Sequence, residues 1–375
     1  MYRLVQRRGI IGLFCLLFVA SSVVPGWAQK DNRFEVSKNL DIFNSLLKEV
    51  EMFYVDSVDV DKTVQRGIEA MLAGLDPYTE YYPEQKTEEL SLMTTGEYGG
   101  IGSLIRQRNN EGGVMIAEPT EGMPADLAGL KPGDLILAID TIDVSKATNS
   151  RVSELLKGVP NTKMVLTIQR PGEKKPRKFE ITRKQITTPQ VTYYGVKNDS
   201  IGYIYLKAFT IKSAQEVKEA FLDLKKNHNI KSLVLDLRGN GGGVLEGAVQ
   251  IVGMFVPKGS EVLSTKGKIK QWDRTYRTST EPLDTVMPLA ILINGGTASA
   301  AEIVSGSLQD MDRAVLVGQR SFGKGLVQAP RDLPYNGKVK ITMSKYYIPS
   351  GRCIQQIDYS HRKEDGSVAA IPDSL

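Results

Sequence analysis

A glycine-rich turn over Asn294–Glu302 carries the residue best suited to nucleophilic chemistry. An apolar run over 289–293 precedes it, and a helix is predicted to begin at about Ser299. Free backbone N–H groups at a helix start stabilise negative charge. A serine held there could attack a carbonyl carbon while neighbouring N–H groups bind the oxyanion that forms. The alternative is that Ser299 only caps its helix.

A second glycine-rich turn, Asp236–Gly243, follows the apolar run Leu233–Leu237 and also precedes a predicted helix. Because the carboxyl ends of neighbouring parallel strands share one edge of a sheet, the two turns can face a common crevice. There the backbone N–H of Gly242 could be a second oxyanion donor. A phosphate-binding loop is the competing interpretation, but neither the P-loop ending nor the Rossmann glycine spacing is present.

A serine nucleophile needs a base, and the sequence offers a lysine. The two histidines, His228 and His361, lie in polar segments that do not suggest a buried imidazole. Lys324, between two glycines, could act as the base if burial lowers its pKa and keeps the amine neutral. Gln328 follows four residues later; on a strand it would share a face with Lys324 and orient the amine. The alternative is an ordinary surface lysine.

Composition excludes several other kinds of protein. The chain has 375 residues, 41% hydrophobic and 24% charged, which suits two or three domains and excludes a disordered or collagen-like chain. The formal charge of +5 falls to +2 once residues 1–28, with three arginines and no acid, are removed, so no nucleic-acid partner is predicted. Two cysteines, Cys15 and Cys353, cannot build a disulfide framework or a thiolate metal cage. We therefore predict no metal and no cofactor.

Residues 1–28 are predicted to be a secretory signal peptide. Three arginines precede the apolar run Ile10–Val24, and Gly26 and Ala28 place small residues three and one before a cut after Ala28. An uncleaved membrane anchor is the alternative, although the run is shorter than the ~20 residues that a span prefers. The sequence thus predicts an exported protein of the periplasm or cell envelope.

Four regions are predicted after this leader. Residues 29–95 form an N-terminal helical region, because apolar side chains recur there at helical spacing. Residues 96–185 hold short strands and two short helices, which suits a small barrel. Residues 186–352 alternate strands and helices, an α/β layer architecture. Residues 353–375 are the start of a C-terminal segment.

Individual elements follow from the same patterns. The expected helices are 43–53, 64–72, 124–130, 152–156, a helix from 213, 244–255 and 299–308, and the expected strands are 114–117, 135–139, 164–169, 178–182, 201–208, 233–237, 289–293, 314–317 and 339–347. Ser213 and Glu216 have the spacing of a capping box.

With these motifs in order, the chain resembles the carboxyl-terminal processing peptidases, or tail-specific proteases, over roughly residues 35–360. The family's serine motif matches Asn294–Glu302, its lysine motif matches Phe322–Gln328, and its Arg-Asn-Gly loop matches Asp236–Gly243. Gly241 stands where the family usually has proline, which removes no backbone donor. The resemblance implies an α/β fold: a ClpP/crotonase-like protease core with an inserted PDZ domain and an N-terminal helical region.

The resemblance also implies a role for each candidate residue. Ser299 is the nucleophile, Lys324 its base and Gln328 the group that holds the amine. The N–H groups of Gly242 and Ala300 form the oxyanion hole. The chain is then a serine endopeptidase that works through an acyl-enzyme. Two alternatives remain open: a catalytically idle, PDZ-bearing peptide-binding scaffold, and a crotonase-like acyl-CoA enzyme, against which the leader weighs.

Residues 96–185 are implied to be the PDZ domain, and residues 186–352 the serine protease core. Tyr98–Gly102 is similar to the PDZ carboxylate-binding loop, in which consecutive N–H groups hold a terminal carboxylate and the peptide adds as a strand. The predicted binding residues are Gly100, Ile101, Gly102 and Leu104, with Val152 or Leu155 from the facing helix. The alternative is a structural glycine turn.

The predicted partners are proteins or peptides with free, apolar C-termini. A homodimer through the helices of residues 33–95 is left open, and no adaptor is identified. Lys157 lies where relatives often carry arginine, so an arginine-based gating contact is not carried over. Relatives usually continue beyond the position of Leu375, and a chain truncated there is expected.

Overall fold

The structure is a computed structural model that describes residues 33–108 and 112–372. The predicted signal peptide, residues 1–28, lies outside the described residues. Within them, no helix is both long enough and apolar enough to span a bilayer. The chain divides into two units, Met1–Arg66 and Gly67–Leu375, and each is described by itself.

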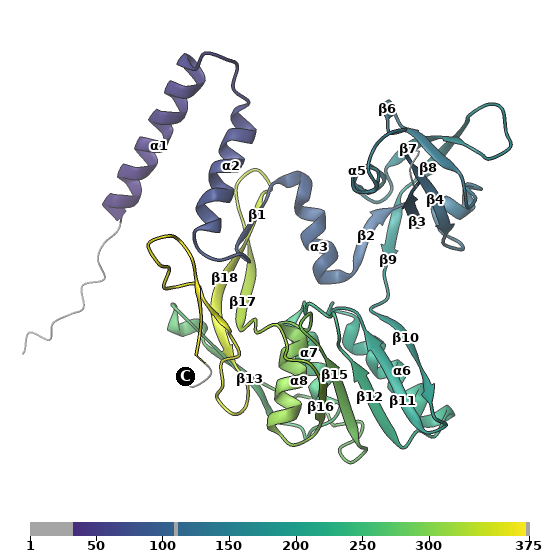
Figure 1. Ribbon diagram of the computed structural model, residues 1–375, viewed down its shortest axis with the longest axis vertical. Helices are drawn as coiled ribbons and strands as arrows, with labels where there is room; N and C mark the ends of the chain where they lie inside the picture. Colours follow the sequence, from purple (N-terminus) through teal and green to yellow (C-terminus); the bar gives the residue numbers. More distant parts are fainter. Residues whose placement is uncertain (1–32, 109–111, 373–375) are drawn as a thin grey trace, which may run out of the picture. The chain divides into compact units, whose positions relative to one another are not determined.

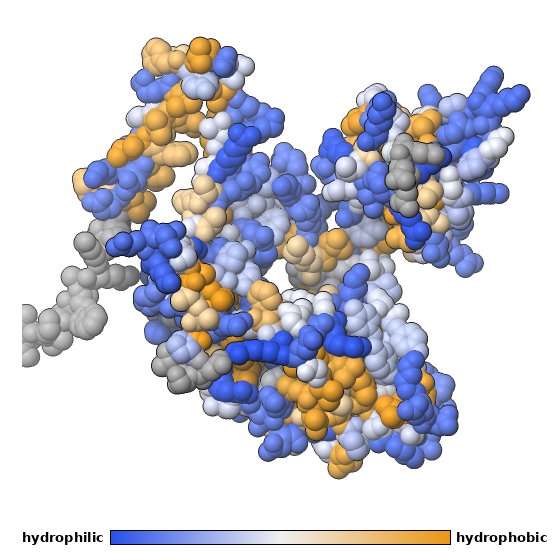
Figure 2. All heavy atoms as spheres, in the orientation of Figure 1, coloured by the Kyte–Doolittle hydropathy of each residue, from blue (hydrophilic) through white to orange (hydrophobic). Residues whose placement is uncertain are grey.

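The described part of the first unit is helical. α1 spans Arg33–Phe53, and α2, Val60–Ala73, begins in this unit. No residue of α1 is buried, and large apolar side chains along it, such as Phe34, Leu40 and Leu46, are more than half exposed (Figure 2). The predicted helices in this region are confirmed, and α1 forms no core of its own.

The second unit opens with the end of α2 and a tight turn at Asp76. The chain then forms β1 (Glu80–Tyr82), a short 3-10 helix η1 (Glu84–Lys86) and α3 (Thr87–Thr95). Next comes β2 (Glu97–Gly100), which pairs antiparallel with β9 (Lys184–Thr187).

Residues 103–182 form a small sheet in the order β3-β4-β5-β7-β8, with β6 beside β5 (Figure 1). The strands are β3 (Ser103–Gln107), β4 (Val114–Pro119), β5 (Leu135–Ile139), β6 (Ile142–Asp143), β7 (Lys163–Gln169) and β8 (Arg177–Thr182). The helices α4 (Pro124–Leu127) and α5 (Asn149–Leu156) flank a core that includes the fully buried Ile116, Ile136 and Leu166. The prediction of short strands with two helices is confirmed, and β3 and β6 are additional strands. Among the described residues the strands form an open sheet that ends at β3 and β8, and not the predicted closed barrel.

The sheet β10-β11-β12-β15-β16 forms the centre of the α/β region. Its strands are β10 (Val191–Lys197), β11 (Ile201–Leu206), β12 (Ser232–Asp236), β15 (Leu289–Ile293) and β16 (Val315–Gly318), and its helices are α6 (Ser213–Asn227), α7 (Leu245–Gly253) and α8 (Ala300–Asp310). All strands except β10 run parallel. Because β12 and β15 are neighbours, the two glycine-rich turns leave the sheet side by side.

A further sheet is antiparallel and has the order β1-β18-β13-β14, with β17 beside β18 (Figure 1). The remaining elements are β13 (Glu261–Gly267), η2 (Lys270–Trp272), β14 (Arg274–Arg277), β17 (Leu326–Asp332), β18 (Lys338–Tyr347), β19 (Ile357–Asp358) and β20 (Ala369–Ala370). From the sequence, β18 was predicted, and a strand was also expected over Lys324–Gln328, where β17 begins at Leu326. This sheet pairs β1 with a strand far along the chain, and local patterns carry no information on such pairing.

The predicted capping box at Ser213 is wrong. Lys212 is the N-cap residue of α6, and the Ser213 hydroxyl donates to the carbonyl of Ala208 at 3.0 Å. The Glu216 carboxylate instead accepts the N–H groups of Gln190 and Val191, at 2.6 and 2.8 Å. The Glu216 carboxylate thus binds a segment distant in sequence, and not the N-terminus of its own helix as the motif predicted.

Candidate active site

Ser299 ends the first glycine-rich turn in a strained backbone conformation. Its φ of 55° lies in the left-handed region that side chains rarely adopt, and it is the N-cap residue of α8. Its N–H donates to Oε2 of Glu302 in the first turn of that helix, at 2.8 Å. Ser299 therefore does cap α8. Strain of this kind is concentrated at functional sites, so the capping position does not exclude chemistry.

Gly242 brings the second turn against Ser299. A Cβ atom at Gly242 would lie 2.8 Å from the Ser299 Cβ and 2.9 Å from the Ala300 nitrogen, so a side chain has no room there. The φ of 92° at Gly242 also favours glycine. The two turns predicted to face a common crevice are therefore in direct contact.

Two side chains of the first turn fasten it to the second. The side-chain oxygen of Asn294 accepts the N–H of Gly239 at 2.9 Å and that of Gly296 at 3.0 Å. The Thr297 hydroxyl donates to the carbonyl of Leu237 at 2.8 Å. The backbone around Ser299 is thus fixed before any substrate arrives.

The N–H of Gly242 is not the bare donor that the sequence suggested. It donates to the side-chain oxygen of Asn240 at 2.9 Å, which closes an Asx turn between Asn240 and Gly242. Asn240 is itself buried, and its amide nitrogen donates to the carbonyl of Leu206 at 2.8 Å. Among the described residues, no protein acceptor is found for the N–H of Ala300, the first residue of α8.

Lys324 lies in the loop between β16 and β17, so the prediction that it shares a strand face with Gln328 is wrong. The strand begins only at Leu326, and its pairing with β18 slips at Val327/Gln328. Burial, together with repulsion by the Lys340 charge, lowers the pKa of Lys324 to about 8. A lysine with this pKa has a neutral amine in about one molecule in ten at pH 7.

Glu302 joins the serine and lysine loops. Its Oε2 accepts the N–H of Ser299 at 2.8 Å and the N–H of Lys324 at 2.9 Å. Its Oε1 accepts the Ser321 hydroxyl at 2.7 Å and the N–H of Gly323 at 2.6 Å. Burial raises the pKa of Glu302, while these four donors favour the carboxylate form. One buried carboxylate thus fixes both loops.

Tyr346 makes a second connection between the same two loops. Its side chain is fully buried, and its hydroxyl donates to the Lys324 carbonyl at 2.8 Å, with the Ser299 carbonyl 3.2 Å away as a second acceptor. Glu302 and Tyr346 therefore bind the N–H groups and the carbonyl groups, respectively, of the two predicted catalytic residues.

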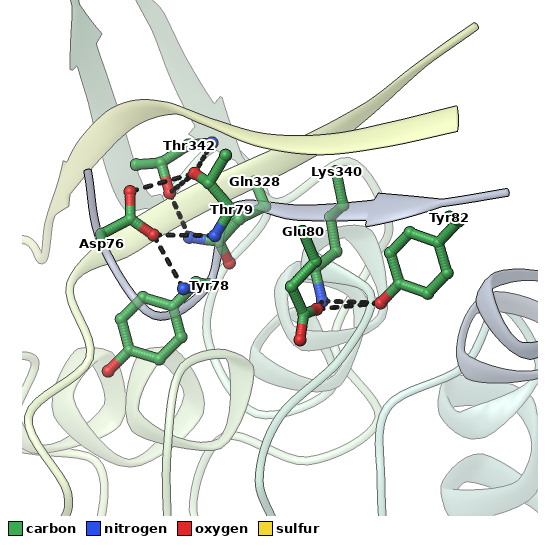
Figure 3. Close-up of polar contacts among 8 residues, drawn as sticks. All are labelled: Asp76, Tyr78, Thr79, Glu80, Tyr82, Gln328, Lys340 and Thr342. Atoms are coloured by element: carbon green, nitrogen blue, oxygen red, sulfur yellow. Dashed lines mark hydrogen bonds and ion pairs between the residues drawn. The ribbon is translucent and has the colours of Figure 1, made fainter. Parts of the chain in front are cut away.

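Gln328 is held by a different set of residues. Its amide nitrogen donates to the Thr342 hydroxyl at 3.1 Å (Figure 3). The N–H of Thr342 donates to the Thr79 hydroxyl at 3.1 Å. Within the part of the chain that the structure describes, no hydrogen bond joins the Lys324 amine to the Ser299 hydroxyl or to Gln328.

A groove between β3 and α5 contains the predicted peptide-binding residues. Gly100, Ile101 and Gly102 line one part of the groove, and Leu104, which is more than half exposed, lines another. The other lining residues are Tyr98, Ser103, Ile105, Asn149, Ser150, Ser153, Leu156 and Lys157. Neither Val152 nor Leu155 lines the groove, because Val152 is fully buried and Leu155 packs against the core. The phase of α5 places Ser153 and Leu156 there instead.

Comparison with known proteins decides the family. Residues 200–360 match peptidase family S41, and residues 115–170 match the PDZ domain. A carboxy-terminal-processing protease of Bartonella bacilliformis is 36% identical over 345 residues, which cover 91% of this chain and 77% of that protein. The chain belongs to peptidase family S41. The predicted family, fold class and enzyme class are confirmed.

Other relatives match this S41 peptidase at lower sequence identity. Proteins of Staphylococcus aureus described as probable CtpA-like serine proteases are 33% identical over 320 residues, 84% of this chain and 62% of their own length. Among solved structures, a photosystem II D1 C-terminal processing protease has 29% identity, covers 86% of this chain and 88% of its own, and superimposes with a TM-score of 0.46.

Three residues of this S41 peptidase that lie at the site were not assigned a role from the sequence: Glu302, Tyr346 and Tyr78, whose ring centroid is 4.3 Å from Nζ of Lys324. Glu302 follows Ser299 by three residues, and that capping-box spacing was a readable signal. Tyr78 and Tyr346 lie outside the serine, lysine and Arg-Asn-Gly motifs, and those motifs gave neither of them a role. Over the described residues, no cluster of three or more His, Cys, Asp or Glu side chains could hold a metal ion.

Proposed function

We propose that this S41 peptidase is an exported serine endopeptidase that recognises protein C-termini through its PDZ domain and cleaves peptide bonds with Ser299 and Lys324. One observation carries the proposal: Glu302 binds the backbones of both residues beside the glycine turn of Gly242. Export rests on the leader pattern of residues 1–28, and the division into a PDZ domain at 96–185 and a core at 186–352 rests on the motifs.

In this mechanism the neutral amine of Lys324 accepts the proton of the Ser299 hydroxyl as its oxygen bonds to the substrate carbonyl carbon. The N–H groups of Ala300 and Gly242 bind the oxyanion, Gly242 turning its N–H from Asn240 to the substrate. The lysine ammonium then protonates the leaving amine. Water, deprotonated by the same lysine, releases the acyl group and restores Ser299.

Gln328 orients the lysine amine in this mechanism. Its amide reaches Thr342 in the conformation seen, so it must exchange that partner for the amine when the substrate binds. An amide suits this task because it carries no charge that would raise the pKa of Lys324. Apo enzymes often hold such contacts open until the substrate complex forms.

Substrate selection is assigned to the PDZ groove. β3 is an edge strand, so a peptide can add beside it, and the carbonyls of Ile101 and Gly102 are already bound by the N–H groups of Ala125 and Thr120. No acceptor for their own N–H groups is found among the residues that the structure describes, and we assign these groups to a terminal carboxylate. Ile101, Ile105 and Leu156 give the pocket an apolar floor, which favours an apolar last residue.

A second copy of the chain is the partner that we propose for the helices of residues 33–95. The apolar side chains of α1 are exposed along its length, and burying them against an identical helix would remove them from water. No adaptor is proposed.

Mass spectrometry of cleavage products tests the proposed function. An unfolded protein with an apolar C-terminus should be cut internally, and the same protein with an amidated C-terminus should be cut far more slowly. Ser299→Ala and Lys324→Ala should each lower kcat by several orders of magnitude while peptide binding is retained. Cleavage by Ser299→Ala at the wild-type rate would show that another group attacks the substrate.

A further inference from the structure

The amine of Lys324 lies against an aromatic ring instead of the nucleophile. Its Nζ is 4.3 Å from the centroid of the Tyr78 ring. The face of such a ring attracts an ammonium group and offers little to a neutral amine. The observed contact is therefore specific for the protonated form of the lysine, which cannot act as a base.

Tyr78 is fixed in place by its own turn. The N–H groups of Tyr78 and Thr79 both donate to Oδ1 of Asp76 at 2.8 Å, which closes the turn that follows α2. The ring packs edge-on against Tyr359, with centroids 5.9 Å apart. Burial and the contact with Tyr359 raise the pKa of Tyr78, so the phenol stays neutral. The ring thus offers a fixed and uncharged face.

The same turn also reaches Gln328. The Thr79 hydroxyl donates to Oδ2 of Asp76 at 3.0 Å and accepts the N–H of Thr342 at 3.1 Å (Figure 3). Thr342 in turn holds the Gln328 amide. One short segment, Asp76–Thr79, therefore contacts the lysine directly and its predicted orienting residue through a single threonine.

We propose that Tyr78 is a positioning residue of the catalytic lysine: its ring holds the ammonium form of Lys324 apart from Ser299, and the amine is released once it has lost its proton to water. The neutral amine can then accept the Ser299 proton. This inference rests on the proposed function, because it assigns a resting position to the base of that mechanism. Because the ring is neutral, its attraction for the amine depends on whether the amine itself is charged.

Other charged groups act on the same amine and contribute to the pKa of Lys324. Lys340 on β18 repels the ammonium, whereas Asp76, Glu80 and Glu302 attract it. Glu80 is ion-paired with Lys340, which reduces the effect of both on Lys324 (Figure 3). A test must therefore change the ring while these four groups stay as they are.

Three substitutions at Tyr78 that differ in the electron density of the ring face meet that condition. Tyr78→Phe keeps the ring and removes only the hydroxyl. Incorporation of 3,4,5-trifluorophenylalanine at the same position keeps the shape and withdraws electron density from the face, and Tyr78→Leu removes the ring. The pKa of Lys324 is followed by NMR titration of the lysine side chain in the inactive Ser299→Ala protein, so this measurement needs no catalysis.

We expect Tyr78→Phe to leave the Lys324 titration unchanged. The trifluorinated ring and Tyr78→Leu should each lower its midpoint by about 0.5 to 1.5 pH units, because the ammonium loses its stabilising partner. In the active enzyme the acid limb of kcat/KM should move to lower pH by the same amount. A structural role alone would lower activity or Tm at every pH and leave both midpoints in place, and that result would overturn the inference.

The two proposals fail in different ways. If the lysine titration responds to the ring but no variant cleaves any substrate, the resting position stands and the peptidase mechanism falls. If cleavage depends on Ser299 while the fluorinated ring leaves the titration unchanged, the mechanism stands and the Tyr78 inference falls. If Tyr78→Leu does not fold, the fluorinated variant alone still distinguishes these two outcomes, because it keeps the shape of the ring.

Discussion

The backbone N–H groups of Ser299 and Lys324 donate to the same carboxylate oxygen of Glu302, at 2.8 and 2.9 Å. The hydroxyl of Tyr346 lies within hydrogen-bond distance of both their carbonyls. The two backbones are therefore held together even though their side chains are not hydrogen-bonded to each other. This separates the fixed part of the site, the two loops, from the movable part, which is the lysine side chain.

Glu302→Gln should disrupt the fixed part. A glutamine offers one oxygen and turns its NH2 group toward two of the four donors, which then lose their acceptor inside the protein. We expect a loss of about 2 to 4 kcal/mol in the free energy of unfolding and at least a tenfold fall in kcat. Denaturant unfolding and steady-state cleavage measure the two effects. Glu246→Gln, at an exposed position of α7, is the matched control and should change neither.

The pH dependence of cleavage should report Lys324. The base must be neutral, and burial lowers its pKa to about 8, so kcat/KM should rise with pH and approach its plateau above that value. The measurement is a profile of kcat/KM from pH 5 to 10 with a peptide that has no titrating side chain. A profile with a midpoint near pH 6 would point to a carboxylate or histidine base instead.

Lys324→Met should stabilise the protein at neutral pH. Because the folded-state pKa of about 8 lies below the ordinary 10.5, the folded protein pays to keep this lysine charged at all lower pH values. Between pH 8 and 10.5 the folded state has lost the proton and the unfolded state has not, so wild-type stability rises with pH. The gain from the substitution, about 1 to 3 kcal/mol at pH 7, should therefore shrink as the pH approaches 10.

Urea unfolding at several pH values measures this effect. Lys345→Met, at an exposed position of β18, is the control and should show no such pH-dependent gain. If the stability difference between Lys324→Met and wild type were the same at pH 7 and pH 10, the pKa of Lys324 would not be lowered in the folded state.

The elements that hold Ser299 could be predicted because their signals are local. An apolar strand, two glycines and a helix start all fall within Leu289–Glu302, and β15 and α8 form there. The parallel order of β12 and β15 followed from the same strand–helix alternation, and with it the contact between Gly242 and Ser299.

The parts that failed depend on contacts between distant segments. Lys324 and Gln328 were placed on one strand, but the loop is bent by its bonds to Glu302, and the strand begins later. Nothing in the sequence links Tyr78 to Lys324, since β1 reaches the site only by pairing with β18. On α5, Val152 packs into the core while Ser153 and Leu156 line the groove, and the apolar spacing did not show which face of the helix meets the groove.

Gly102→Ala should impair peptide binding by the groove. A Cβ there would come within 2.4 Å of the Met123 Cβ, so the carboxylate-binding loop would have to shift. We expect the affinity for a peptide with an apolar C-terminus to fall at least tenfold, measured by fluorescence polarisation. Gly122→Ala is the matched control: its φ of 70° is close to the 67° of Gly102, but a Cβ there meets nothing within 4 Å. Equal losses in the two variants would show that backbone strain, and not the loop position, is responsible.

Ser153→Val should change which peptides the groove prefers. The wall that α5 presents to the groove is polar, formed by Asn149, Ser150 and Ser153, while the floor beneath the last residue is apolar. Because alternate side chains of an added strand point the same way, the third residue from the C-terminus should face this wall. Wild-type protein should favour a hydroxyl or amide side chain there.

A peptide library varied at that single position measures the preference. With Ser153→Val the optimum should move toward apolar side chains by about three- to tenfold, because a hydrogen bond is lost and an apolar surface is gained. Glu154→Val introduces the same residue at the exposed neighbouring position of α5 and should leave the preference unchanged. If the library shows no selection at that position in either protein, a peptide does not lie along β3 in the proposed direction, and recognition is limited to the terminal residue and its carboxylate.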